Sequence, residues 1–84
     1  MAEEIGIDVE VFDKTLQCES EYRWDAVGDK GASIGVAQLR YPTRDWGIST
    51  SSALDPYKNI MVAAKAFKNG LAKKWTCYRD LKGI

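Results

Sequence analysis

The chain lacks histidine altogether and has only two cysteines and two prolines among its 84 residues. Without histidine, a Ser/His/Asp triad and any metal site built on imidazole are excluded. Two cysteines with no further cysteine or histidine also fall short of the four ligands of a structural zinc site. We therefore expect neither a metal nor another cofactor.

An excess of charge of one sign is also missing. Twelve basic residues balance twelve acidic ones, and no basic block stands out. This balance argues against nucleic acid or an anionic membrane as the main partner. No apolar run approaches the roughly 18 residues that a membrane span needs. The acidic start, MAEEIGIDVEVF, lacks the basic and apolar regions of a signal peptide, so we expect that an export signal was removed or never present.

The length of the chain allows one small domain, residues 1–84. Such a domain buries only roughly 60 to 65 % of its unfolded surface, so a cross-link would matter for its stability. A disulfide between Cys18 and Cys77 would stabilise it by roughly 4 kcal/mol on the chain-entropy model. It would also imply an oxidising setting such as the periplasm or the cell exterior. Two buried free thiols are the alternative, and the sequence leaves both open.

The first predicted helix has Asp8 as its N-cap and runs to about Glu19. Its apolar stripe consists of Ile5, Val9, Phe12 and Leu16. Glu19 continues the face of Phe12 and Leu16, which would partly desolvate its carboxylate near the negative end of the helix dipole. Both effects raise a carboxyl pKa, and a raised pKa is what a general acid needs.

The second predicted helix starts with Asp55 as N-cap and Pro56 at the first helical position. It continues to about Lys74, with Gly70 as a weak spot. Its apolar stripe consists of Ile60, Ala63, Ala64, Phe67 and Leu71.

Between these helices, the glycines of residues 25–35 predict a tight turn or short hairpin, with Val27 and Ile34 as paired positions. Residues 36–46 are predicted as a short helical segment that Pro42 interrupts or restarts. The segment GISTSSAL is predicted as a polar loop, and the tail WTCYRDLKGI should pack its aromatics on the body. The expected fold is mainly α, of the α+β kind, with two main helices.

The run ESEYRWDAVGDKGASIGVAQL resembles the catalytic segment of the lysozyme-like superfamily, in the group of soluble lytic transglycosylases and goose-type lysozymes. In that group a helix ends in Glu-Ser, an aromatic and an Ala-Val pair follow, and Gly-x-x-Gln closes the segment. LDPYKNIMVAAKAF is similar to the family's later helix. A cysteine just before the glutamate, with Trp-x-Cys-Tyr near the end, resembles small bacterial and phage members.

The resemblance implies cleavage of the MurNAc–GlcNAc bond of peptidoglycan, with Glu19 protonating the leaving oxygen. In the transglycosylases the same carboxyl then acts as base, and the substrate's own hydroxyl closes an anhydro sugar. We place this reaction ahead of two alternatives, a hydrolytic lysozyme and a non-catalytic peptidoglycan-binding module. Hydrolysis usually needs a second carboxylate. Asp29 is the first candidate, before Asp25 and Asp45, although an aspartate between glycines also simply makes a turn.

The resemblance also assigns residues to substrate binding. Gln38 would hydrogen-bond sugar hydroxyls or the acid's carboxyl, Ser33 could bind an N-acetyl group, and Ser20 could orient Glu19. Surface, turn and capping roles are the respective alternatives. Aromatics that could stack on sugar faces are Tyr22, Tyr41, Trp46 and Tyr78. Aromatics expected in the core are Trp24, Trp75 and Phe67.

The chain is short for the family, so we expect that loops enclosing distal sugars are missing and that the groove is more open, with fewer subsites. The sequence also departs from the family pattern at two points. Val36 and Ala37 stand where Leu-Met is common, and the late Ala-x-x-Tyr-Asn-Ala-Gly segment has no counterpart, so Tyr78 is the tyrosine that could replace its tyrosine. The expected partner is the glycan strand of peptidoglycan. The expected setting is extracellular, periplasmic or virion-associated, as a monomer or within a larger phage or secretion assembly.

Overall fold

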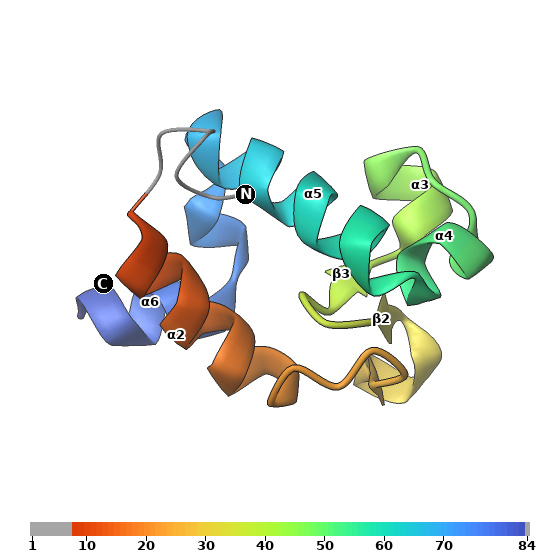
Figure 1. Cartoon of the computed structure of the whole chain (residues 1–84), viewed down its shortest axis with the longest axis horizontal. Coiled ribbons are helices and arrows are strands. Elements are labelled where there is room, and N and C mark those ends of the chain that lie inside the picture. The colour runs from red at the N-terminus through yellow and green to blue at the C-terminus, as the bar shows by residue number, and fades with distance from the viewer. Residues whose placement is uncertain (1–7, 84) are drawn as a thin grey trace.

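The computed structural model describes residues 8–83. It is mostly helical with one small sheet, as the sequence predicts (Figure 1). The α-helices are α2 (Val9–Ser20), α3 (Pro42–Trp46), α4 (Thr50–Leu54), α5 (Pro56–Lys68) and α6 (Thr76–Lys82). The strands are β1 (Val27–Gly28), β2 (Ser33–Ile34) and β3 (Leu39–Arg40), and two 3₁₀ turns are η1 (Asp29–Gly31) and η2 (Ala72–Lys74). Helices α2 and α6 pack together at one end, and α3 and α4 lie at the other (Figure 1).

Helix α2 begins and ends close to where the sequence predicts. The Asp8 carboxylate caps it by accepting a hydrogen bond from the Val11 backbone N–H at 3.2 Å. The expected stripe is buried at Phe12 and Leu16, whereas Val9 is 40 % exposed. Ile5, the remaining member of that stripe, lies outside the described residues. The core face of α2 therefore leads directly to its last turn, which carries Glu19.

The predicted hairpin forms with the predicted pairing, Val27 opposite Ile34, in an antiparallel sheet of order β1-β2-β3. The prediction of one helical segment over residues 36–46 is wrong for its first part. The Gln38 backbone N–H donates to the Gly35 carbonyl at 3.0 Å, which closes a turn and returns the chain as β3. Helical structure in this segment starts only at Pro42.

Helix α4 corrects the prediction of a loop over residues 47–54, because the Ser49 hydroxyl caps a short helix by accepting from the Ser52 N–H. Helix α5 begins at Pro56 behind its Asp55 cap, as predicted, but ends at Lys68 instead of about Lys74. The backbone at Gly70 adopts a φ of +80°, which turns the chain out of the helix. Residues 72–74 then form η2.

The core gathers side chains from α2, the β2–β3 turn, α5 and the segment before α6. Its buried members are Phe12, Leu16, Val36, Ala37, Leu39, Ala63, Ala64, Ala66 and Trp75. Phe67 packs against this cluster, with its ring 5.1 Å from that of Trp75. The expectation that Trp24 belongs to the core is wrong, because that side chain is 56 % exposed. The short Arg23–Asp25 loop that carries it follows the left-handed turn that ends α2.

Three elements hold the β2–β3 turn (residues 35–38) by buried hydrogen bonds. Asn59 of α5 accepts from the Ala37 N–H at 2.8 Å and donates to the carbonyls of Ile34 and Ala53. The Trp75 indole donates to the Ala37 carbonyl at 2.7 Å. The Ser20 hydroxyl at the end of α2 donates to the Val36 carbonyl at 2.6 Å. This turn is therefore fixed with respect to α2, α5 and residue 75.

Replacing Asn59 with alanine should lower the free energy of unfolding by about 3 kcal/mol, because it leaves three buried backbone groups without partners. The melting temperature should fall by about 15 °C. Urea and thermal unfolding measure both. Asn69→Ala, at the exposed end of α5, is the matched control and should stay within about 0.5 kcal/mol of the parent. Equal losses in the two variants would contradict the assigned role of Asn59.

A disulfide joins α2 to α6. Cys18 and Cys77 are bonded with a Cα–Cα distance of 6.0 Å, so the structure contains the paired alternative and no free thiol among the described residues. It closes a loop with a sequence separation of 59. Among residues 8–83, no helix combines the length and apolar character that crossing a bilayer requires.

Candidate functional site

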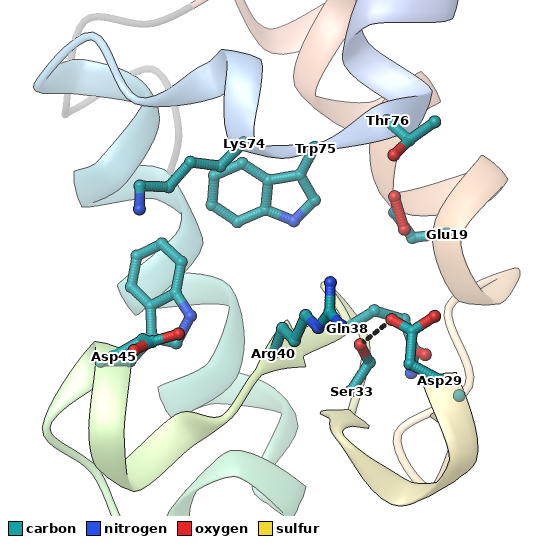
Figure 2. A pocket seen from close by; sticks show the side chains of 11 residues that line it. Glu19, Asp29, Ser33, Gln38, Arg40, Asp45, Lys74, Trp75 and Thr76 are labelled. Atoms are coloured by element: carbon teal, nitrogen blue, oxygen red, sulfur yellow. Dashed lines mark hydrogen bonds between the residues drawn. The ribbon is translucent and has the colours of Figure 1, made fainter.

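A cleft of about 380 Å³ lies between the end of α2, the sheet and the segment before α6 (Figure 2). Its lining residues are Glu19, Gly28, Asp29, Ser33, Gln38, Arg40, Asp45, Trp46, Lys74, Trp75 and Thr76. Figure 2 shows Glu19 and Asp29 on one side, and Asp45 and Lys74 on the other. The cleft thus brings together residues that lie far apart in the sequence.

The Glu19 carboxyl is the group in this cleft with a raised pKa. Burial is the largest cause, and the nearby carboxylates of Asp29 and Asp80 add to it. A hydrogen bond from the backbone of Cys77, near the start of α6, acts in the opposite direction. The net result is a half-buried acid that holds its proton to higher pH than an ordinary glutamate.

Asp29 lies on the same side of the cleft as Glu19, in η1 directly after β1 (Figure 2). Its backbone has a φ of 50°, in the left-handed region that aspartate tolerates better than most residues. The buried Ser33 hydroxyl donates to its carboxylate. This bond fixes the carboxylate at the edge of the sheet. Asp29 therefore both makes the turn and faces the cleft.

Gln38 lines the cleft, but its amide nitrogen is occupied. That nitrogen donates to the carbonyls of Ala26 and Gly35 at 3.0 and 2.9 Å. Its amide oxygen lies so close to Gly28 that a Cβ there would come within 2.5 Å of it. The side chain of Gln38 therefore links the hairpin to the β2–β3 turn by hydrogen bonds. Its amide oxygen is the atom that can still accept a hydrogen bond from a ligand.

The opposite side of the cleft is basic and aromatic. Arg40 of β3 and Lys74 of η2 line it, and the Lys74 ammonium lies 5.8 Å from the centre of the Trp46 ring. Trp46 in turn packs on Trp75, with ring centres 5.5 Å apart. The Asp45 carboxylate accepts two hydrogen bonds from the Arg44 guanidinium, at 2.9 and 3.2 Å. Hydrogen bonding to Arg44 is the largest cause that lowers the pKa of this carboxyl, and the positive charges of Arg44, Lys74 and Arg40 lower it further.

Five residues that the sequence singled out lie outside this cleft. Ser20 is buried under the β2–β3 turn, and Tyr22 donates back to Asp13 on the outer side of α2. Tyr41 lines a neighbouring hollow that shares Asp29 and Arg40 with the cleft. Tyr78 packs its ring 5.5 Å from Phe67, and Asp25 faces Arg23 at 3.9 Å.

The cleft also contains residues that the sequence reasoning did not select, namely Gly28, Arg40, Lys74 and Thr76. Trp75 was expected only in the core, and it serves both as core and as cleft wall. A signal existed for Arg40. It pairs with Ser33 in the sheet, and residues directly opposite in an antiparallel pair share a face. That signal required recognising residues 39–40 as a strand.

No group of three His, Cys, Asp or Glu side chains within residues 8–83 could hold a metal ion. What the cleft offers is a half-buried acid, a second carboxylate, hydrogen-bonding groups and indole surface. Comparison with models of protein families, with curated proteins and with solved structures gave no match.

Proposed function

We propose that this protein cleaves glycosidic bonds of peptidoglycan, with Glu19 as general acid and base. The observation that carries the proposal is the Glu19 carboxyl, which lines a cleft and has a raised pKa because burial disfavours its charged form. A carboxyl group that stays neutral near working pH can protonate a leaving oxygen. The resemblance of the run from Glu19 to Leu39 to lytic transglycosylases gives the substrate class.

In the reaction we favour, Glu19 donates its proton to the glycosidic oxygen and the bond from that oxygen to the anomeric carbon breaks. A hydroxyl of the same MurNAc then attacks the anomeric carbon and returns a proton to Glu19. No water is consumed, and the product carries an anhydro end. The half-buried indole of Trp46 offers apolar surface for a sugar face.

Hydrolysis is the second candidate, and one observation favours it. Asp29 faces the same cleft and its charge contributes to the raised pKa of Glu19. A second carboxylate of this kind could activate a water or stabilise an oxocarbenium-like transition state. Against this role, one oxygen of Asp29 already accepts the Ser33 hydroxyl.

Incubation with purified peptidoglycan should release soluble glycan fragments, and the masses of their ends identify the reaction. An anhydro end is lighter than a reducing end by one water, so mass spectrometry separates transglycosylation from hydrolysis. Binding to the wall without any released fragment would contradict the enzymatic proposal and support a peptidoglycan-binding module. The disulfide fits an extracellular, periplasmic or virion-associated setting, which we propose with the same function.

A further inference from the structure

The side of the cleft opposite Glu19 carries more positive than negative charge among the described residues, because two cations line it beside the single carboxylate of Asp45. Arg40 and Lys74 both line this side and are exposed. The carboxylate among its lining residues, Asp45, is held by Arg44 through two hydrogen bonds. In the part of the chain that the structure describes, neither Arg40 nor Lys74 forms an ion pair. Two cations are therefore left to face a ligand.

The acidic and basic sides are separated along the sheet. Asp29 follows Gly28 of β1, Gly28 pairs with Ser33 of β2, and Ser33 pairs with Arg40 of β3. This row crosses two strand spacings, roughly 10 Å. Figure 2 shows the same order, with Ser33 between Asp29 and Arg40. The floor of the cleft thus has a negative and a positive end.

We propose that Arg40 and Lys74 bind a carboxylate carried by the glycan strand, and that the opposed charges of the cleft fix the direction in which the strand lies. This inference rests on the proposed function and adds a specificity site to it. A carboxylate at the other end would meet the charge of Asp29, and like charges repel. Arginine binds carboxylates through its planar fork, and lysine adds a mobile point charge.

Trp46 supports this assignment by its position. Its ring lies under the Lys74 ammonium and packs on Trp75, so indole surface lies directly beside the cations. A sugar ring on that surface could present a carboxylate to Arg40 and Lys74. The carboxylate could be the lactyl group of a peptide-free MurNAc or belong to a stem peptide. Both sources share the same chemistry.

Titration calorimetry on the Glu19→Gln variant tests the inference without turnover. Three probes are compared: a neutral N-acetylglucosamine tetramer, a peptide-free GlcNAc–MurNAc tetrasaccharide, and the same tetrasaccharide with stem peptides. At least one carboxylate-bearing probe should bind about tenfold more tightly than the neutral one, and the preference should weaken with added salt. The probe that binds more tightly than the neutral one shows whether the recognised carboxylate belongs to MurNAc or to a stem peptide. Equal binding of all three, or no binding of any, would overturn the inference.

Two further variants in the Glu19→Gln background locate the effect. Arg40→Gln with Lys74→Gln should abolish the preference for the carboxylate-bearing probe. Arg23→Gln with Lys73→Gln removes the same charge from exposed positions outside the cleft and should keep the preference. If the control pair lost this binding preference to the same extent, the overall charge of the protein would be attracting the carboxylate, and the inference would fail. Because binding is measured without turnover, failure here is distinct from failure of the proposed cleavage, which is read from released fragments.

Discussion

Replacing Glu19 with glutamine should reduce the release of soluble fragments from purified peptidoglycan by about a thousandfold. Glutamine has the size of glutamate, and its amide oxygen can still accept a hydrogen bond from the backbone of Cys77. It has no acidic proton that it could give to a leaving oxygen at working pH. Loss of activity would therefore report the missing acid. Fragment release is measured by chromatography, and far-UV circular dichroism checks that α2 and α6 remain folded.

Glu21→Gln is the matched control for this change. Glu21 is exposed, two residues further along the chain, and outside the cleft. It undergoes the same chemical substitution of a carboxyl group by an amide. Its fragment release should stay close to that of the parent. Equal activity in all three proteins would mean that Glu19 is not the acid.

The pH profile of the parent gives an independent check on the same carboxyl. A general acid works in its protonated form, so activity should be retained at low pH and lost as the pH rises through the folded-state pKa of Glu19. Because burial raises that pKa above the ordinary value of 4.5, the alkaline limb should also lie above 4.5. If activity fell with a midpoint at or below pH 4.5, the ordinary pKa of a glutamate, Glu19 would behave as a fully solvated acid and the assignment would be contradicted.

Removing the disulfide by Cys18→Ala with Cys77→Ala should lower the free energy of unfolding by about 4 kcal/mol. The cross-link restricts the unfolded chain over a sequence separation of 59, which is a long loop for a domain of 84 residues. Folded proteins of this kind are stabilised by only about 5 to 15 kcal/mol in total. Urea unfolding at a fixed temperature gives the difference.

Reducing the parent protein with dithiothreitol is the control for this double variant. The reduced parent and the variant should unfold at similar urea concentrations, because both lack the same covalent bond. If the free energy of unfolding of the double variant differed from that of the oxidised parent by less than about 1 kcal/mol, packing of α2 on α6 would be enough to hold the two helices together without the disulfide. The result also bears on Glu19, which follows Cys18 and accepts from the backbone of Cys77.

The sequence predicts best where a local signal fixes the structure. Asp8 and the Asp55-Pro56 pair mark the starts of α2 and α5, because the capping carboxylates act within three residues. The pairing of Val27 with Ile34 follows from the glycine-rich hairpin between them. The end of α5 and the short helix α4 were mispredicted, since a five-residue helix shows too little periodicity and a glycine can either interrupt or end a helix.

The acidic side of the cleft was the easier one to predict, because the sequence selected Asp45 and Trp46 on the opposite side but not Arg40 or Lys74. Glu19 and Asp29 belong to one continuous run of sequence, so a motif can bring them together. Lys74 and Thr76 reach the cleft only because the disulfide and the indole of Trp75 bring a distant segment against α2 and the β2–β3 turn. Such long-range placement depends on tertiary packing, which composition and periodicity do not encode.

The cleft would lose one wall if the chain were shortened from its carboxyl end past Cys77. A truncation before Trp75 would take away the indole that holds the Ala37 carbonyl, together with the partner of Cys18. Thr76 would also be gone from the cleft. The smallest fragment able to keep a ligand site therefore has to include nearly the whole described chain, and grafting the Glu19 segment alone onto another scaffold would transfer the acid without its surroundings.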